Sequence, residues 1–185
     1  DRPVTGAILF TRHSRATRRI TEQFESRMIR KIYWAVVEGL VEPKVGVWRD
    51  FIRKIPDQPQ AEVVPESHPD ARLAVLNYRV LQQWDNLTWL EIQLETGRMH
   101  QIRIQASSRN HAVVGDWQYG SSIDLTPSQA DLRLKPIALH ARQLTFLHPM
   151  TFETLTVTAP LPPYWTRMSP VFARFEAVLE DPGTG

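Results

Sequence analysis

The 185-residue chain contains no cysteine. This absence excludes disulfide bonds and thiolate metal sites, and it makes a reducing cytoplasm the simplest compartment to expect. No apolar run approaches the roughly 18 to 20 residues that a membrane-spanning helix needs, and no signal peptide precedes the first apolar run. We therefore expect a cytoplasmic protein that does not act on a membrane.

Several familiar catalytic signatures are also missing. The sequence has no glycine-rich phosphate loop and no dinucleotide-binding fingerprint. None of its six histidines lies at metal-ligand spacing beside carboxylates. No serine stands in the context of a nucleophile elbow. We therefore expect no metal site and no serine-hydrolase chemistry.

Acidic residues are missing from one long stretch. Residues 96–105 read TGRMHQIRIQ, and no acid occurs between Glu95 and Asp116. Residues 1–31 are basic as well, with eight lysines and arginines against three acids. Because the whole chain carries a net charge of only +2, these clusters are local. They predict a surface that binds a polyanion, although a solvated arginine-rich helix face would explain them equally simply.

Aromatic residues accompany the basic clusters. Tyr33 and Trp34 follow the first cluster, and Trp117 and Tyr119 follow the second. Arginines bind phosphates and aromatic rings stack on bases, so this combination is typical of RNA-binding proteins. RNA is therefore the polyanion that we expect.

Alternating and β-branched segments predict several strands. Strands are expected at 5–11, 31–39, 73–84, 87–95, 138–149 and 151–160, with shorter fragments near 45–51. The pair Asp85-Asn86 suits a hairpin turn. From Leu90 to Leu94 every second residue is apolar, which predicts one buried and one exposed face.

Helical spacing is confined to a few segments. A helix is expected over 15–29, capped by Ser14, with an apolar stripe of Ile20, Phe24 and Met28. A short helix is expected over about 100–108, and a last amphipathic helix begins at Ser169. The pattern predicts an α+β fold: a mixed, mostly antiparallel sheet flanked by a few helices.

Two stretches in the second half belong together. They are ETGRMHQIRIQ, at 95–105, and GDWQYG, at 115–120. Together they resemble the third motif of the RluA-type pseudouridine synthases, which is TGR, any residue, HQ, an aliphatic residue and R, with a GD..YG loop downstream.

Three further stretches resemble this family. The second motif of the family is similar to KIYWAVVEG, at 31–39. The first motif usually reads HRLD, any two residues and TSG, and its second half is similar to DRPVTG, at 1–6. The family's C-terminal pattern is similar to LHARQLTFLHP, at 139–149, with Ala159-Pro160. Because the matches are collinear, the chain is identified as a member of this family with its catalytic fold.

The resemblance implies a reaction and its catalytic residues. Members isomerise uridine to pseudouridine in RNA, here rRNA or tRNA, without metal or organic cofactor. The resemblance makes Asp1 the nucleophile, Arg103 its ionic partner, and Tyr33 the residue that packs on the base and accepts its C5 proton. A carboxylate suits this role because it is an anionic nucleophile that can leave again, and an arginine keeps it ionised.

Further side chains are expected to contact RNA. These candidates are Arg2, Arg15, Arg18, Arg19, Lys31, Arg98 and His100. His140 and His148 are expected to be structural hydrogen-bonding residues, and Gln105 stands where many members have histidine. We expect the protein to act as a monomer.

The chain departs from the family pattern at its start. The residues HRL and the strand region that precede the aspartate in the family are absent before Asp1. We therefore expect residues 1–185 to form a single catalytic domain that lacks its N-terminal portion.

Other interpretations stay open at this point. The chain could be a non-catalytic RNA-binding module derived from the same fold. In that case Asp1 is a frayed terminal residue, Tyr33 a core residue and Arg103 a surface helix residue. A glycosidase or nucleosidase would need a second carboxylate about 5 to 10 Å from the first, and the sequence offers Asp1 no convincing partner.

Overall fold

One sheet dominates the protein, which a computed structural model describes over residues 1–126, 131 and 135–168. Its strands are β1 (Thr5–Gly6), β2 (Arg30–Glu38), β3 (Val45–Lys54), β4 (Ala61–Val64), β5 (Arg72–Trp84), β6 (Leu87–Leu94), β7 (Leu139–Leu147) and β8 (Thr154–Thr158). The other elements are the helices α1 (Ser14–Glu25), α2 (Gln101–Ser107) and α3 (Pro163–Met168), and the 3-10 turn η1 (Trp117–Tyr119).

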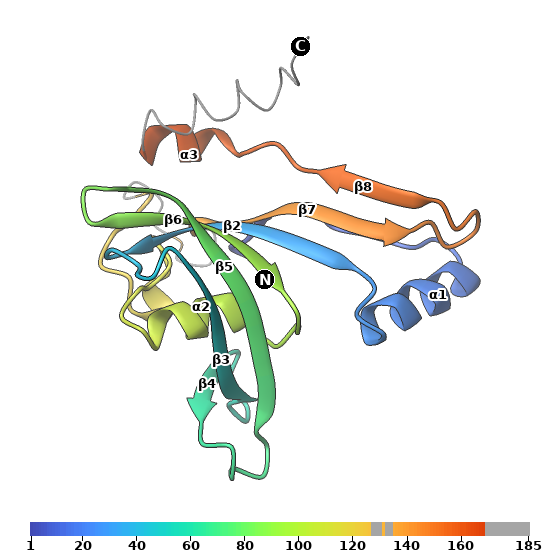
Figure 1. Cartoon of the computed structure of the whole chain (residues 1–185), viewed down its shortest axis with the longest axis horizontal. Coiled ribbons are helices and arrows are strands. Elements are labelled where there is room, and N and C mark those ends of the chain that lie inside the picture. Colours follow the sequence, from blue (N-terminus) through green and yellow to red (C-terminus); the bar gives the residue numbers. More distant parts are fainter. Residues whose placement is uncertain (127–130, 132–134, 169–185) are drawn as a thin grey trace.

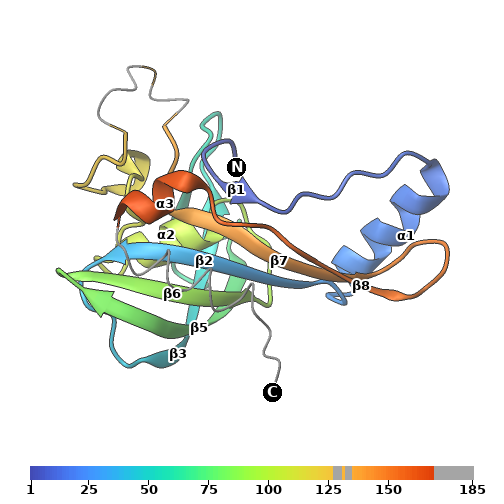
Figure 2. The same cartoon turned by 90° about the horizontal axis from the view of Figure 1, so that it is seen from above.

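The sheet is mixed and mostly antiparallel, as predicted. Its strand order is β1-β7-β2-β6-β5-β3-β4, with β8 added beside β7 (Figure 1). Only β1 and β7 run parallel among the described strand pairs. The helices α2 and α3 lie on opposite faces of the sheet, and α1 lies at one end of it (Figures 1 and 2). The α+β class is therefore confirmed.

The strand β2 forms the centre of the core. It pairs with β6 on one side and β7 on the other, and residues 34–37 are buried throughout. Its β-branched and aromatic residues suit a strand that is covered on both faces. The indoles of Trp34 and Trp89 meet edge to face with centroids 4.9 Å apart. The alternation predicted from Leu90 to Leu94 is confirmed, because Leu90 and Ile92 are fully buried while Glu91 and Gln93 are less buried.

The predicted hairpin between β5 and β6 is confirmed. Asp85 and Asn86 both have positive φ, at 42° and 59°. Two consecutive left-handed residues are the mark of a type I′ turn, in which asparagine and aspartate are tolerated.

The first strand is shorter than predicted. The expected strand at 5–11 ends after Gly6, and Ile8 and Phe10 are 76% and 78% exposed. Gly6 has a φ of +115°, and a β-carbon there would lie 2.3 Å from the carbonyl oxygen of Ala141. The chain leaves β7 after this glycine, with one further bond from the amide of Ala7 to the carbonyl of Ala141, and Ile8 and Phe10 lie outside the core.

Hydrogen bonds hold this short strand in place. The side chain of Thr5 is 2.8 Å from Nδ1 of His140, which is 1% exposed. The amide of Ile137 donates to the carbonyl of Pro3 at 3.2 Å. The structural role predicted for His140 is confirmed, as is that of His148, whose Nδ1 accepts the amide of Thr151. The result is a fixed path for the residues around Asp1.

The helix α1 also differs from its prediction. It ends at Glu25 rather than near residue 29, because Arg27 adopts a left-handed φ of 58°. The N-cap is His13 and not Ser14, and no side chain caps the helix. Of the predicted apolar stripe only Ile20 is buried, while Phe24 and Met28 are 44% and 57% exposed. This helix therefore packs on the sheet through a narrow contact.

The remaining helices complete the fold. The helix predicted over 100–108 is confirmed as α2, whereas α3 was not predicted and places Trp165 in the core. The helix expected from Ser169 lies outside the described residues. None of the described helices combines the length and the apolar character needed to cross a bilayer.

Candidate active site

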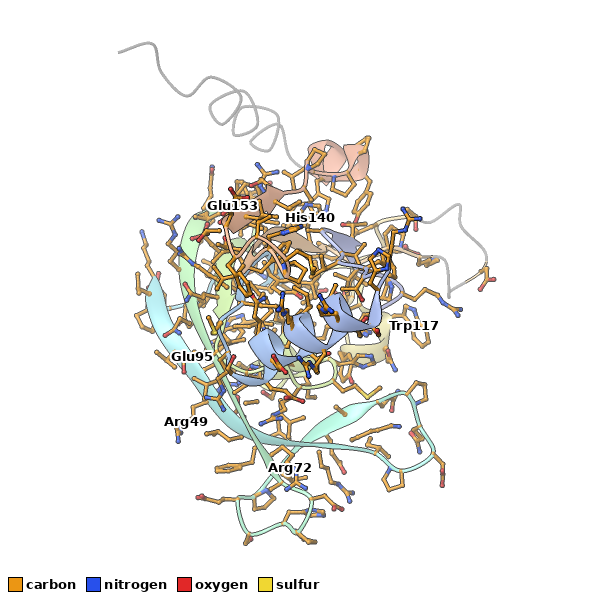
Figure 3. The ribbon with its side chains drawn as sticks, turned by 90° about the vertical axis from the view of Figure 1, so that its right-hand side faces the viewer. Arg49, Arg72, Glu95, Trp117, His140 and Glu153 are labelled. Carbon is orange, nitrogen blue, oxygen red and sulfur yellow. The ribbon has the colours of Figure 1, made fainter. Side chains whose placement is uncertain are left out.

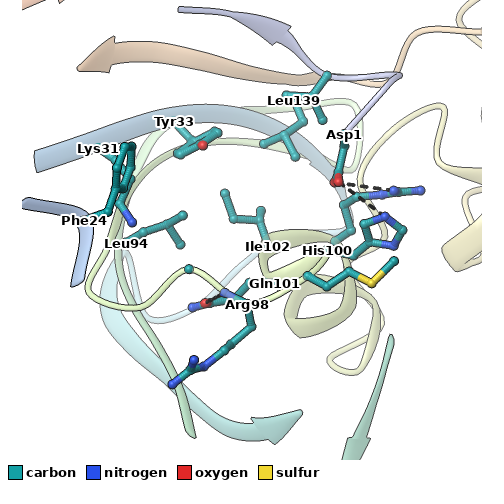
Figure 4. Close-up of a pocket in the computed structure, with 14 residues that line it drawn as sticks. Asp1, Phe24, Lys31, Tyr33, Leu94, Arg98, His100, Gln101, Ile102 and Leu139 are labelled. Atoms are coloured by element: carbon teal, nitrogen blue, oxygen red, sulfur yellow. Dashed lines mark hydrogen bonds and ion pairs between the residues drawn. The ribbon is translucent and has the colours of Figure 1, made fainter. Parts of the chain in front are cut away.

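A cavity of about 390 Å³ lies between β2, the N-terminal residues and α2 (Figure 4). Its walls include all three predicted catalytic residues, Asp1, Tyr33 and Arg103. These residues come from segments that are about 30 to 100 positions apart in the sequence. The cavity is therefore a product of the sheet topology, and we take it as the candidate active site.

The carboxylate of Asp1 stands at one side of this cavity. Its Oδ1 lies 3.3 Å from Nε2 of His100, and its Oδ2 lies 3.6 Å from Nη1 of Arg103. The Asp1 side chain is 26% exposed. It is thus held near a cation and a ring nitrogen but remains open to the cavity.

Arg103 has a second and closer carboxylate partner, which the sequence analysis missed. Its Nε and Nη2 donate to the two oxygens of Asp116 at 2.6 and 2.8 Å, and Nη2 also donates to Gln118 at 2.7 Å. The side chains of Arg103 and Asp116 are only 4% and 1% exposed. The expected approach of Asp1 to Arg103 is present at 3.6 Å, and Asp116 is an additional, closer partner. The only signal in the sequence was the GD of the GDWQYG loop.

This arrangement leaves one edge of the guanidinium for Asp1. A guanidinium has five N–H groups in a fixed fork, and Asp116 and Gln118 occupy those of Nε and Nη2. The two N–H groups of Nη1 remain on the side that faces Asp1. Because Asp116 takes the bidentate position on Arg103, Asp1 lies beside this cation at 3.6 Å without a bidentate bond to it.

His100 is held in a strained conformation beside Asp1. It precedes α2 with a left-handed φ of 53°, which costs about 1 kcal/mol or more for a residue with a β-carbon. Its Nδ1 lies 2.8 Å from the hydroxyl of Tyr119, which accepts the amide of Ala61 at 2.9 Å. Burial, followed by the positive charge of Arg103, lowers the pKa of His100 to about 4.

A consistent proton arrangement follows for this neutral histidine. Tyr119 donates its proton to Nδ1 of His100, and Nε2 carries the ring proton toward Asp1. Both ring nitrogens thus have protein partners. The contact with RNA predicted for His100 stays a prediction, and the geometry favours orientation of Asp1 instead.

The TGR turn that leads into α2 is built around Gln101. The side-chain oxygen of Gln101 accepts bonds from the hydroxyl of Thr96 and the amide of Arg98, at 2.8 and 3.0 Å. Its amide group donates to the carbonyl of Val75 at 3.1 Å. The glutamine of the HQ motif therefore ties the turn to β5, which fixes the start of α2 beside Asp1.

Gln105, which had no role in the sequence analysis, holds the back of α2. It donates to Oδ2 of Asp50 at 2.6 Å, and Arg109 donates to both oxygens of the same carboxylate. Asp50 belongs to β3, so these bonds attach α2 to the sheet. The role of Gln105 is structural and lies outside the cavity.

Two residues of β2 face the cavity from the other side. Lys31 and Tyr33 are two positions apart and therefore project from the same face of the strand. Burial raises the pKa of Tyr33. Burial, followed by the charge of Arg27, lowers the pKa of Lys31. The cavity thus holds a neutral phenol and a half-buried amine opposite the Asp1 carboxylate (Figure 4).

The structure separates the predicted RNA-binding residues into groups. Lys31, Arg98 and His100 line the candidate active site, and Arg2 lines a second cavity beyond Asp1. The remaining three are on α1, away from both cavities; these are Arg15, Arg18 and Arg19. Their role in binding RNA stays a prediction.

The described residues contain no cluster of three histidine or acidic side chains arranged to hold a metal ion. The chemistry that this site offers comes from a carboxylate, a guanidinium, a neutral imidazole and a phenol.

The buried His100 predicts a specific loss of stability in acid. The unfolded histidine titrates near 6.5 and the folded one near 4, so between these values only the unfolded state binds the proton. The free energy of unfolding should therefore fall as the pH decreases through this window. In His100→Gln this part of the loss should disappear, as measured by urea unfolding at neutral pH and at about pH 5. An equal acid-induced loss in both proteins would contradict the buried neutral state.

The comparisons with known proteins point to one family. The sequence profile of the RNA pseudouridylate synthase family matches residues 1–108. An uncharacterized RNA pseudouridine synthase of Chloroflexus aurantiacus is 37% identical over 88% of this chain and 48% of its own length. Ribosomal large subunit pseudouridine synthase D of Xanthomonas campestris is 32% identical over 88% of this chain and 50% of its own length.

Two further matches extend the comparison. tRNA pseudouridine synthase C of Haemophilus influenzae is 28% identical over 91% of this chain and 74% of its own length. The solved structure of human RNA pseudouridylate synthase domain containing 4 superposes with a TM-score of 0.65 at 25% identity, covering 83% of this chain and 66% of that one.

The chain spans about half the length of the first curated relatives that it matches. The match of the family profile covers more than half of the chain, including Asp1, Tyr33 and Arg103. The chain therefore belongs to the RNA pseudouridylate synthase family, and to its RluA type.

Proposed function

We propose that this protein isomerises uridine in RNA to pseudouridine, with Asp1 as the nucleophile. The observation that carries this proposal is the convergence of Asp1, Tyr33 and Arg103 on one cavity, from three distant segments. The family membership supports the reaction type. The lack of cysteine supports action in the cytoplasm.

The reaction rearranges one nucleoside without a net change in atoms. The bond between N1 of the base and C1′ of the ribose breaks, and a bond between C5 and the same C1′ forms. The proton on C5 is lost and N1 gains one. Asp1 forms a transient covalent bond to the substrate and leaves again, which divides one difficult displacement into two easier steps.

The surroundings of Asp1 suit a nucleophile. The positive charge of Arg103 attracts the Asp1 carboxylate, while the distance of 3.6 Å leaves Oδ2 available to react. The imidazole of His100 directs a neutral N–H to Oδ1 and so fixes the orientation of the group. A carboxylate bound bidentately, like that of Asp116, would be a weaker nucleophile.

Tyr33 is proposed to pack on the target base and to pass on its C5 proton. Because burial raises the pKa of Tyr33, its phenol is protonated at neutral pH. This phenol takes up the C5 proton on its oxygen while it gives its own proton to solvent in the open cavity, and N1 takes a proton back from solvent, so Tyr33 acts as a relay.

The substrate is proposed to be rRNA or tRNA. Two of the relatives are named as a ribosomal large subunit enzyme and a tRNA enzyme. The target uridine must leave its stack to enter the cavity, which costs a few kcal/mol and less in a loop. Lys31 and Arg98 line the cavity, which supports a role for them in binding its phosphates.

A glycosidase mechanism is less well supported. It needs two accessible carboxylates, one of which exchanges a proton. The structure does bring Asp116 near Asp1, but Asp116 is 1% exposed and both its oxygens accept bonds from Arg103. Asp116 is therefore not available as a general acid or base.

The substitution Asp1→Asn tests the proposed nucleophile. An amide cannot form the covalent intermediate, so pseudouridine formation should fall by roughly a thousandfold or more. RNA affinity should change little, because the amide keeps the shape of the side chain. The assay is pseudouridine formation on total rRNA and tRNA by the wild-type protein and the variant, with Asp85→Asn as the control for loss of an exposed carboxylate.

Two outcomes would contradict the proposal. Substantial turnover by Asp1→Asn would exclude Asp1 as the nucleophile. RNA binding by the wild-type protein without any isomerisation would favour the non-catalytic RNA-binding module.

The substitution Tyr33→Phe separates packing from proton transfer. Phenylalanine keeps the ring, so KM for RNA should stay close to that of the wild type. Loss of the hydroxyl should lower kcat by about 10²- to 10⁴-fold. Tyr33→Leu should in addition raise KM, because the ring is lost. An unchanged kcat in Tyr33→Phe would limit Tyr33 to packing.

A further inference from the structure

A second cavity lies on the far side of the Asp1 carboxylate. Its volume is about 530 Å³, and its walls include Arg2, Trp117 and Ile137. It shares Asp1, His100 and Arg103 with the candidate active site. Asp1, His100 and Arg103 therefore lie between the two cavities and line both of them.

The exposed indole of Trp117 is the unusual feature of this cavity. Trp117 is 55% exposed, although it is the largest type of apolar side chain. The other tryptophans are buried or partly buried. Figure 3 shows Trp117 on the flank of the molecule, away from the buried His140. An exposed indole at the edge of a cavity offers an aromatic face on which a base can stack.

The backbone that carries Trp117 is fixed on both sides. Asp116 before it is bound to Arg103, and Gln118 after it accepts from Arg103 and donates to the carbonyl of Pro59 at 3.0 Å. Backbone bonds close the turn, with the amides of Tyr119 and Ser121 donating to Asp116. The ring is thus presented from a rigid turn, which lowers the entropy lost when a ligand stacks on it.

The charges of the second cavity suit a nucleotide. Arg2 makes no ion pair within the described part of the chain and is exposed, so its guanidinium is available to a phosphate. Lys135 is bound to Asp124, which satisfies its charge. Asp116 is neutralised by Arg103. Among the described residues that line it, the cavity therefore offers the free cation of Arg2 beside the exposed aromatic face of Trp117.

We propose that the second cavity binds the nucleotide next to the target uridine, with its base stacked on Trp117 and its phosphate at Arg2. This inference rests on the proposed function, because it places the target uridine in the first cavity. An RNA strand whose uridine reacts at Asp1 continues on both sides of that residue. One direction leads past Lys31 and Arg98 to a hollow beside α1, and the other leads past Asp1 to Trp117.

The proposal assigns sequence-tolerant recognition to this position. Stacking on an aromatic ring accepts every base, since each base has a π-face. Specificity for the flanking nucleotide would come from base size and from the polar groups of the cavity rather than from a full set of hydrogen bonds. The subsite would chiefly hold the strand while the uridine turns into the first cavity.

Binding of short oligouridine to Trp117→Ala and Trp117→Phe tests the subsite directly. Stacking should quench tryptophan emission in the wild-type protein with a uridine trinucleotide at concentrations far below those needed with uridine monophosphate, which cannot occupy both cavities at once. Trp117→Ala should lose about tenfold or more in affinity for the trinucleotide, and Trp117→Phe should retain most of it. Val157→Ala, which shortens an exposed apolar side chain on β8, should bind like the wild type.

Kinetics on RNA distinguish this subsite from the catalytic machinery. Trp117→Ala should raise KM with little change in kcat. The midpoint of its urea-induced unfolding should equal that of the wild type. Equal trinucleotide affinity in Trp117→Ala and the wild type would overturn the subsite, even if the protein forms pseudouridine. Failure of the wild type to form pseudouridine would overturn the proposed function instead, while Trp117-dependent binding would still be measurable.

Discussion

The buried ion pair between Arg103 and Asp116 is the interaction on which the candidate site depends. A guanidinium that is only 4% exposed would cost several kcal/mol if it were left without a partner. Asp116 and Gln118 satisfy Nε and Nη2, which fixes the plane of the group and leaves Nη1 toward Asp1. The same pair fixes the turn that presents Trp117. One buried cation thereby organises both cavities.

The fold brings these side chains together through a few constraints. The close approach of Gly6 to Ala141 allows the short parallel strand that carries Asp1 to the sheet. The central strand β2 supplies Tyr33, and the bonds of Gln101 to Thr96, Arg98 and Val75 set the start of α2. The left-handed His100 shows that local strain is accepted here in exchange for a ring that bonds to both Asp1 and Tyr119.

Much of the fold was predictable because its signals are local. The β-branched run of β2 and the Asp85-Asn86 turn both have direct signatures in the sequence, and the residues of the cavity followed from the family resemblance. The closer partner of Arg103, Asp116, was missed, because pairing between a helix and the loop that follows it leaves no periodic trace. The early ends of β1 and α1 were also missed, since they depend on the backbone angles of Gly6 and Arg27.

The most direct test of this account is a double-mutant cycle on the rate of pseudouridine formation, with Asp116→Asn, Arg103→Lys and both together. If Asp116 acts only by holding Arg103, the double variant should be no slower than Arg103→Lys alone, within about twofold. Urea midpoints of all four proteins would confirm that they are folded. Losses that multiply in the double variant, or full activity in Arg103→Lys, would contradict the central place given to this ion pair.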